Sequence, residues 1–212
     1  MKELRLLICA DLHASEDAIK LLGKVASEDT FDAVVVCGDL TTYGSEKYVK
    51  KVMDTFGPKL LTVPGNCDTA DTLKLLEQSG CSLHGASFEI DGRVFYGCGG
   101  GLPSTASMPF ELDEQEMVRI LNDVAVKGGV MVTHTPPQGM NDVDRSGRNA
   151  GSRGIMGVIE KHRPRMVLSG HIHESRGCKE TDGTVFVNPG PASRGAHYAI
   201  ARIGEDIQVD LF

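Results

Sequence analysis

The sequence contains no run of about 18 consecutive apolar residues, the length that a membrane-spanning helix needs. It also lacks an excess of positive charge, because 29 acidic residues outnumber 22 Lys and Arg and give a net charge of -7. These two absences argue against a bilayer span and against broad, nonspecific affinity for nucleic acid or anionic membranes. Neither a membrane nor a nucleic acid is therefore favoured as a partner.

Closely paired cysteines are missing as well. The six cysteines are scattered without a CxxC spacing, so the sequence predicts neither a disulfide framework nor a zinc ribbon. The segment 1–13 has a short apolar stretch, but Asp11 and His13 interrupt it and it lacks a small-residue cleavage site. We expect this segment to form a strand and not a signal peptide, and we expect a cytoplasmic location.

Five apolar runs rich in Val, Leu and Ile are present, and each ends at a Gly, a Pro or a polar residue. Continuous runs of this length are typical of strands buried on both faces. Helical patterns separate most of them, and the first begins with Ser15 as an expected N-cap. Strands that alternate with helices predict right-handed crossovers and a largely parallel core. The runs are residues 4–13, 32–40, 59–68, 129–137 and 165–174, and the helical patterns are residues 15–28, 45–56, 69–80, 113–126 and 152–164.

Turn signals indicate antiparallel strands beside the parallel ones. Asp91-Gly92 and Asp182-Gly183 each separate two alternating segments, which predicts two hairpins, and residues 197–212 add another alternating pair. We predict an α/β fold in which two mixed sheets pack face to face as a β-sandwich with helices outside, giving four layers (αββα). No repeat, linker or low-complexity segment divides the chain, so we assign residues 1–212 to one domain.

Oxygen and nitrogen donors follow each of the five apolar runs. Ligands of open α/β sheets bind beyond the carboxyl ends of the strands, so we expect these side chains to converge on one rim. Such donors suit first-row divalent metals and not calcium, and seven are enough for two ions if one carboxylate bridges. Asp39 is the expected bridge, because Gly38 permits close approach. The candidate ligands are Asp11, His13, Asp39, Asn66, His134, His171 and His173.

Two metals about 3.5–4 Å apart form a clamp for phosphoryl chemistry and turn a bound water into hydroxide near neutral pH. The motifs DLH, GDL, GNCD, THTPP and GHIHE, in this order, resemble the five motifs of the calcineurin-like metallophosphoesterase superfamily. This resemblance implies the two-sheet sandwich and two divalent ions, for which Mn²⁺, Fe²⁺, Ni²⁺, Co²⁺ and Zn²⁺ all tolerate such donors. By resemblance, Asp11, His13, Asp39 and His173 hold the first ion, and Asp39, Asn66, His134 and His171 hold the second.

Cys67 departs from the family pattern. Most members have a histidine there, which acts with the following acidic residue, here Asp68, to contact the phosphate and help the leaving group depart. A thiol near its usual pKa of about 8.5 is mostly neutral at pH 7 and donates hydrogen bonds poorly. We therefore interpret Cys67 as a replacement at a catalytic position, and neither as a metal ligand nor as a nucleophile. Small microbial members that resemble this chain share Gly-Asn-Cys-Asp, and their branch is associated with phosphodiester hydrolysis.

The predicted function is a phosphoester hydrolase with two metals, which uses metal-bound hydroxide on a small phosphorylated substrate, preferably a phosphodiester. One alternative is a phosphomonoesterase or protein phosphatase, which the missing histidine disfavours. Another is a protein-binding scaffold on the same fold, which has no need of all seven ligands. A nuclease stays open, although no accessory domain or basic stripe supports it.

Residues 139–157, which follow the His134 run, are polar, rich in glycine and carry three arginines. Ser152 is the expected N-cap of the next helix, and a helix N-terminus with nearby guanidinium groups suits an anion. The segment is either a loop that grips the substrate or an exposed loop with no such role. The candidate substrate-binding residues are Arg148, Arg153 and, in a similar position, Arg194.

Overall fold

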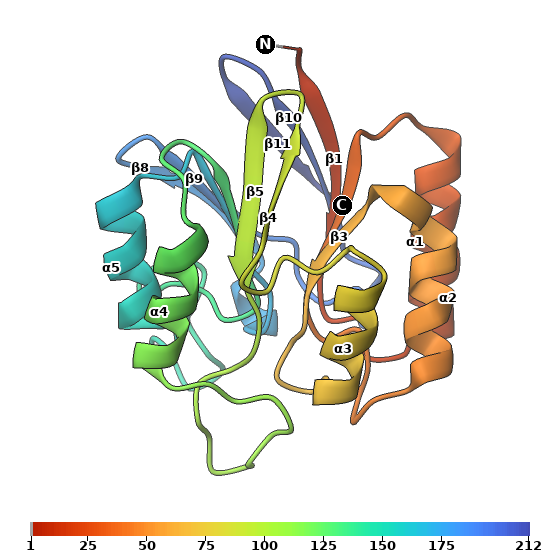
Figure 1. Ribbon diagram of the computed structural model, residues 1–212, viewed down its shortest axis with the longest axis horizontal. Helices are drawn as coiled ribbons and strands as arrows, with labels where there is room; N and C mark the ends of the chain where they lie inside the picture. The colour runs from red at the N-terminus through yellow and green to blue at the C-terminus, as the bar shows by residue number, and fades with distance from the viewer. Residues whose placement is uncertain (1) are drawn as a thin grey trace.

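The computed structural model describes residues 2–212, which form two mixed β-sheets packed face to face (Figure 1). One sheet has the strand order β11-β10-β1-β2-β3, and the other has the order β4-β5-β6-β7-β9-β8. The strands of the first are β1 (Leu4–Cys9), β2 (Ala33–Cys37), β3 (Leu60–Val63), β10 (Ala199–Ile203) and β11 (Ile207–Leu211). Those of the second are β4 (Ser87–Ile90), β5 (Arg93–Cys98), β6 (Val130–Thr133), β7 (Met166–Leu168), β8 (Gly177–Thr181) and β9 (Thr184–Asn188).

The five helical patterns of the sequence all form helices, and a polar side chain caps each N-terminus. Ser15 accepts a hydrogen bond from the backbone N–H of Ala18, as its position in the sequence predicts. The last helix ends where Arg163 adopts a left-handed φ of 50°, directly before Pro164. The helices are α1 (Glu16–Glu28), α2 (Glu46–Phe56), α3 (Ala70–Gln78), α4 (Glu114–Val124) and α5 (Arg153–His162), and short 3₁₀ turns are η1 (Gly57–Lys59) and η2 (His173–Ser175).

Three apolar layers hold these elements together. The central layer joins the facing sides of the two sheets, where residues such as Ile8 and Val132 are fully buried. A second layer packs α1, α2 and α3 on the first sheet, and a third packs α4 and α5 on the second (Figure 1). Each fully buried Val, Leu or Ile side chain contributes about 1.5–3 kcal/mol. The predicted four-layer sandwich is therefore confirmed.

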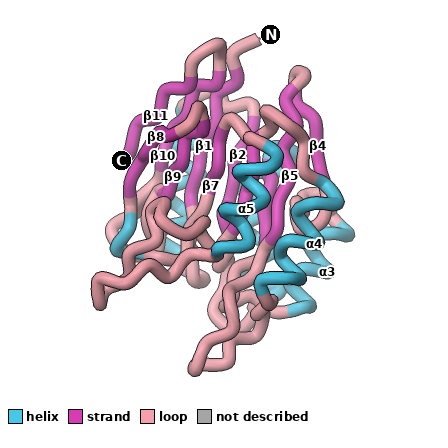
Figure 2. The backbone as a smooth tube through the Cα atoms, turned by 90° about the vertical axis from the view of Figure 1, so that its left-hand side faces the viewer, coloured by secondary structure: helices cyan, strands magenta, loops and turns pink. Residues whose placement is uncertain are grey.

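The parallel strands of both sheets point toward the same end of the molecule. β1, β2 and β3 pair in parallel, and so do β5, β6, β7 and β9. Figure 2 shows that long loops gather at the lower end, where these strands finish. The hairpins at Asp91-Gly92 and Asp182-Gly183 and the β10–β11 pair also form as predicted. No helix described between residues 2 and 212 is long and apolar enough to cross a membrane.

Candidate metal centre

The candidate ligands lie on loops that follow β1, β2, β3, β6 and β7. Four of them, Asp11, His13, Asp39 and His171, have left-handed φ angles of 56°, 44°, 51° and 67°. Such a backbone costs about 1–3 kcal/mol at a non-glycine residue, so neighbouring structure must hold it. The N–H of Asp11 donates to the carbonyl of Gly38 at 3.0 Å, and that of His13 donates to the carbonyl of Asp39 at 2.9 Å. The two loops therefore hold each other in this strained conformation.

One group of donors gathers around Asp11. Its Oδ1 lies 3.2 Å from Nε2 of His173 and 3.9 Å from Nε2 of His13. The same Nε2 of His13 lies 3.6 Å from Oδ2 of Asp39. The structure thus brings together four side chains from the loops after β1, β2 and β7.

A second group gathers around His134, whose side chain is fully buried. Its Nδ1 lies 2.8 Å from the carbonyl oxygen of Cys37, and a carbonyl can only accept, so Nδ1 carries the proton. In the neutral ring the lone pair is then on Nε2, which lies 2.9 Å from Oδ1 of Asn66 and 3.5 Å from Oδ1 of Asp39. Three potential ligand atoms, one each from His134, Asn66 and Asp39, therefore lie close together. Against the effect of burial, the negative charges of Asp39 and Asp11 raise the pKa of His134, so without a metal ion a proton on Nε2 is favoured at this place.

His171 completes the second group. The centroid of its ring lies 4.9 Å from that of the His134 ring. The backbone N–H of His171 donates a hydrogen bond of 3.2 Å to Oδ2 of Asp11. Burial, with a smaller contribution from His134, lowers the pKa of His171 to about 4, so its ring is neutral at pH 7. Neutral imidazole is the form that binds a metal.

Two glycines are needed for this close packing. A Cβ at Gly38 would lie 2.5 Å from Nδ1 of His134, and a Cβ at Gly170 would lie 2.9 Å from Oδ2 of Asp11. Both contacts are shorter than real Cβ atoms make. The two glycines therefore let the backbone approach the donors.

A divalent cation fits this arrangement. Oδ1 of Asp11 is buried and accepts no hydrogen bond, although an unpaired buried carboxylate oxygen is costly. The adjacent atoms of His134, Asn66 and Asp39 could bind a metal ion in place of a proton on Nε2 of His134. Two sets of three residues each place one potential ligand atom per residue within 4.8 Å of the other two. One set is Asp11, His13 and His173, and the other is Asp11, Asp39 and His134. A positive ion in each set would balance the negative charge of its carboxylates.

The model of the calcineurin-like phosphoesterase family matches the chain over residues 4–175, a range that includes all of these donors. The chain belongs to this family. It is 32% identical over 176 residues to an uncharacterized protein of Methanocaldococcus jannaschii, which covers 78% of this chain and 80% of that protein. The chain is thus a hydrolase of phosphate esters that depends on divalent metal ions.

Solved structures agree with the fold. The phosphoesterase superimposes on TT1561 of Thermus thermophilus with a TM-score of 0.71 and 16% identity, covering 99% of both chains. A structure described as a novel archaeal phosphodiesterase gives a TM-score of 0.57 at 15% identity, with 99% of this chain and 100% of that one covered. At these identities the likeness concerns the fold alone.

Cys67 of the phosphoesterase lies at the centre of the site. Its sulfur, a ring nitrogen of His13 and a carboxylate oxygen of Asp39 lie within 4.8 Å of one another, a closeness that the sequence did not predict. Burial, followed by the negative charge of Asp39, raises the pKa of the Cys67 thiol far above its usual range. With no ion bound, the thiol is therefore neutral.

The carboxylate of Asp68, which the sequence predicts to be a catalytic contact, accepts four hydrogen bonds from the chain itself. Its side chain is fully buried, and each carboxylate oxygen accepts two hydrogen bonds. One oxygen accepts from the N–H and hydroxyl of Thr41, both at 2.8 Å, and the other accepts from Leu40 at 3.1 Å and Gly65 at 2.8 Å. Asp68 therefore ties the loop of Asp39 to the turn that begins at Gly65, and it is a positioning residue.

The N-terminus of α5 does not offer the anion site that the sequence suggested. The carboxylate of Glu114 already accepts from the hydroxyl of Ser152 and from the N–H groups of Arg153 and Gly154. A carboxylate of the chain itself thus occupies the helix end.

The three candidate arginines differ in what their side chains contact. Arg148 lies 3.4 Å from Asp144 and donates to Ser146 at 2.7 Å, and Arg153 donates to Gln138 at 3.1 Å. Among residues 2–212, the guanidinium of Arg194 makes no hydrogen bond or ion pair. The preceding residue, Ser193, donates its N–H to the carbonyl of Asp11 at 3.1 Å, which places Arg194 beside the metal centre.

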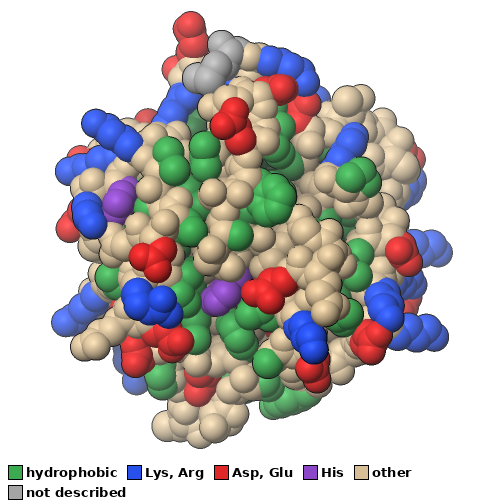
Figure 3. Space-filling view, in the orientation of Figure 1, with side chains coloured by type: hydrophobic (Ala, Val, Ile, Leu, Met, Phe, Trp, Pro, Cys, Tyr) green, Lys and Arg blue, Asp and Glu red, His purple; other side chains and the backbone are tan. Residues whose placement is uncertain are grey.

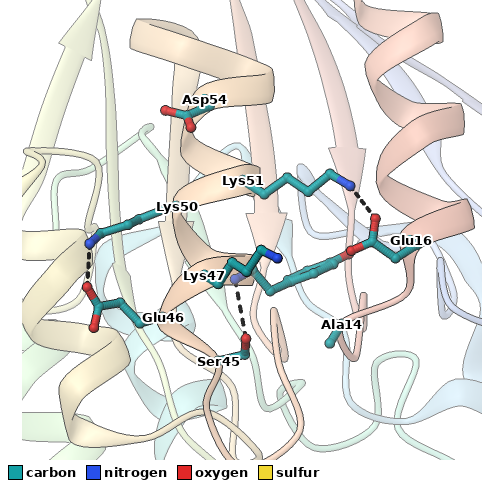
Figure 4. A pocket seen from close by; sticks show the side chains of 9 residues that line it. Ala14, Glu16, Ser45, Glu46, Lys47, Lys50, Lys51 and Asp54 are labelled. Atoms are coloured by element: carbon teal, nitrogen blue, oxygen red, sulfur yellow. Dashed lines mark hydrogen bonds and ion pairs between the residues drawn. The ribbon is translucent and has the colours of Figure 1, made fainter.

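A wide groove with a volume of about 990 Å³ lies between α1 and α2, and none of the proposed metal ligands lines it (Figure 4). Lys50 pairs with Glu46, and Lys51 pairs with Glu16 across the groove. Its charges are thus largely balanced, and it offers no set of metal donors.

The sequence reasoning missed the loop 99–112, which lies against the metal centre. The N–H of Phe110 donates to the carbonyl of Asn66 at 3.1 Å, and that of Gly100 donates to the carbonyl of Pro64 at 2.9 Å. A Cβ at Gly101 would lie 2.7 Å from Cβ of Asn66. Three consecutive glycines, residues 99–101, were the available signal, because they permit this close approach.

Proposed function

We propose that this phosphoesterase hydrolyses phosphodiesters with two divalent metal ions, and that residues 1–212 act as one domain around them. Asp39 is the proposed bridge, because one of its oxygens lies 3.6 Å from His13 and the other lies 3.5 Å from His134. Mn²⁺, Fe²⁺, Ni²⁺, Co²⁺ and Zn²⁺ all suit the donor set. The proposed ligands are Asp11, His13, Asp39 and His173 for one ion, and Asp39, Asn66, His134 and His171 for the other.

Paired divalent ions, when bound, neutralise charge on the phosphoryl oxygens and acidify a water. Hydrogen bonds within the chain hold the proposed ligand side chains in position. The carbonyl of Cys37 holds the ring of His134, and Asp68 holds the loop that carries Asp39. Arg194, whose exposed side chain follows the backbone contact between Ser193 and Asp11, is proposed to bind a phosphate oxygen.

The preference for diesters rests on one observation, the thiol of Cys67 beside Asp39, because a thiol cannot carry the positive charge of an imidazolium. A phosphomonoester carries almost one more negative charge than a diester at neutral pH, because its second pKa is about 6. A neutral thiol adds no positive charge to balance it and donates no proton to a poor leaving group. Substrates with one negative charge on the phosphate therefore fit position 67 better. The fold is also shared with the archaeal phosphodiesterase.

The proposed substrate is a small molecule. Acidic and basic side chains are interspersed on the face in Figure 3, and the chain carries a net charge of -7. This distribution does not favour a long polyanion, whose binding relies on many positive contacts.

The test is an activity panel. The protein is stripped of metal, reloaded with each of the five ions in turn, and assayed on aryl phosphodiesters and monoesters with the same leaving group. We expect kcat/KM to be higher for the diester with the best ion. A higher value for the monoester would overturn the diester preference. A protein that holds two ions and cleaves neither substrate would overturn the enzymatic proposal and favour a binding scaffold.

A further inference from the structure

A small pocket lies at the end of the sheets opposite to the metal centre. It has a volume of about 90 Å³, and its lining includes Arg93, Lys127 and Arg165. These residues lie at or just before the starts of β5, β6 and β7, whereas His134 and His171 follow the ends of β6 and β7. Figure 1 shows the β4–β5 turn near the N-terminus, with the arrowhead of β5 pointing away from it. The pocket is therefore separate from the phosphoesterase site.

The lining of this pocket is positively charged although the chain as a whole is acidic. It contains two arginines and one lysine, and no Asp or Glu lines it. Within the described residues 2–212, none of the three cations forms an ion pair. The groove between α1 and α2, in contrast, is lined by Glu16, Glu46 and Asp54 as well as by lysines.

Arg93 is the most unusual member of this group, since its exposed fraction is only 7%. Its Nη1 donates to the carbonyl of Lys2 at 2.7 Å, and its Nη2 lies 3.4 Å from the carbonyl of Gly204. Its Nε is buried and has no partner. Arginine is rarely buried without an acidic partner, because neutral carbonyls do not balance its charge.

Arg165 adds a second guanidinium at the same place. It also donates to the carbonyl of Gly204, at 3.0 Å, and to the carbonyl of Glu205. The guanidinium groups of Arg93 and Arg165 thus both contact the carbonyl oxygen of Gly204, and their positive charges repel each other. Lys127 is exposed at the mouth and has an unpaired ammonium group. A negative ion in the pocket would relieve this repulsion.

We propose that this pocket binds a small oxyanion with the size and charge of inorganic phosphate or sulfate. The volume suits an ion of a few heavy atoms and excludes a nucleotide. Guanidinium and ammonium groups are the side chains that bind such ions with charge-assisted hydrogen bonds. The bound ion would join the start of the first sheet, through Lys2 and Gly204, to the second sheet, through Arg93 and Arg165.

The test uses the full-length protein loaded with Zn²⁺, which is diamagnetic, and inorganic phosphate as the probe. Backbone amide shifts are followed during a phosphate titration, with chloride added to a parallel sample at equal ionic strength. The N–H groups of Gly128 and Gly129, which line the pocket, should shift with phosphate and not with chloride. Phosphate at the metal centre would shift the amides around His134 and His171, so the two sites are distinguished.

Lys127→Ala is the main variant, because this exposed side chain makes no hydrogen bond within the described structure and its loss should not affect folding. We expect phosphate binding at the pocket to weaken about tenfold, as expected for the loss of a charge-assisted contact. Lys47→Ala, which removes an exposed lysine from α2, is the matched control and should leave the pocket affinity unchanged. Gly128 and Gly129 amides that respond equally to chloride would overturn the proposal, and so would an unchanged affinity in Lys127→Ala.

Discussion

The backbone N–H of Cys67 donates a hydrogen bond of 2.8 Å to Oδ1 of Asp39. Its carbonyl oxygen accepts a second hydrogen bond, of 2.9 Å, from the N–H of Tyr43. The thiol accepts a weak hydrogen bond of 3.8 Å from Nδ2 of Asn66, and it also lies near His13 and Asp39. Residue 67 is thus fixed by its main chain, so its side chain can be replaced without displacing Asp39.

Cys67→Ser should keep most of the diesterase activity. Serine preserves the backbone contacts and the neutral side chain, whereas it could not replace a thiolate that attacks the substrate. The measurement is kcat/KM on an aryl phosphodiester, with metal content determined on the same sample. An inactive variant that still holds two ions would give the thiol a direct role in the reaction.

Cys67→His should raise monoesterase activity relative to diesterase activity. Imidazole can donate a hydrogen bond to the phosphate and a proton to a departing alkoxide, which a thiol does badly. The gain should be larger for alkyl leaving groups than for nitrophenolate, which departs without a proton. An unchanged ratio of the two activities would contradict the assignment of this position.

Asp39→Asn should lower the occupancy of both metal sites, because the bridging carboxylate loses its charge. Asparagine tolerates the left-handed φ of 51° at this position, so the loop should keep its conformation. Elemental analysis gives the metal content per chain. Asp182→Asn is the matched control, since Asp182 has the same φ of 51° in an exposed turn before β9, which lies at the end of the sheet opposite to the donors after β7. Two tightly bound ions in Asp39→Asn would count against the proposed bridge.

Arg194→Ala should raise KM about tenfold without loss of metal, because the proposed charge-assisted contact of its guanidinium to phosphate would be lost. Arg148→Ala is the control, since Asp144 and Ser146 already occupy that side chain. Steady-state kinetics on the preferred diester measure the effect. A raised KM in Arg148→Ala with none in Arg194→Ala would return the substrate contact to the loop 139–157.

His84 should make the folded state less stable in acid. Burial lowers its pKa to about 4, and its Nδ1 accepts the N–H of Gly99 at 3.0 Å, which requires the neutral ring. Below about pH 6.5 the unfolded chain binds a proton at His84 that the folded chain does not, so stability falls until about pH 4. The loss is at most about 3 kcal/mol, from a pKa difference of about 2.5 at 1.36 kcal/mol for each unit.

The measurement is urea unfolding of the parent and of His84→Asn between pH 4 and pH 7. Asparagine keeps an acceptor near the position of Nδ1 and does not titrate. All other residues are the same in both proteins, so their contributions cancel in the difference between the two free energies of unfolding. As the pH falls, the free energy of unfolding of the parent should decrease more than that of His84→Asn. A difference that is independent of pH would show that His84 does not control this window.

Local structure followed closely from the sequence. Ser15, Ser45, Thr69, Asp113 and Ser152 all cap helices, because short polar side chains compete for backbone N–H groups at helix starts. The hairpin turns follow from the left-handed φ angles that Asp-Gly pairs accept. The convergence of the donors also followed from the sequence, since the carboxyl ends of parallel strands share one edge.

Contacts between segments far apart in the chain did not follow from it. The burial of Asp68 depends on N–H groups of Leu40 and Thr41, 28 and 27 residues away. Glu114 reaches the start of α5 from about 40 residues earlier in the chain. A pattern of residue types records neither distance nor direction between such segments, so neither set of hydrogen bonds could be predicted from the sequence.

The donors of the proposed centre come from both sheets: Asp11, His13, Asp39 and Asn66 follow strands of the first, and His134, His171 and His173 follow strands of the second. An ion held by Asp11 and His173 would act as a removable crosslink that closes a loop of about 160 residues, as a disulfide does. At an ion concentration of 1,000 times Kd, such a crosslink adds about 4 kcal/mol to the free energy of unfolding. The heat resistance of this protein would then depend on the supply of metal as much as on its apolar layers.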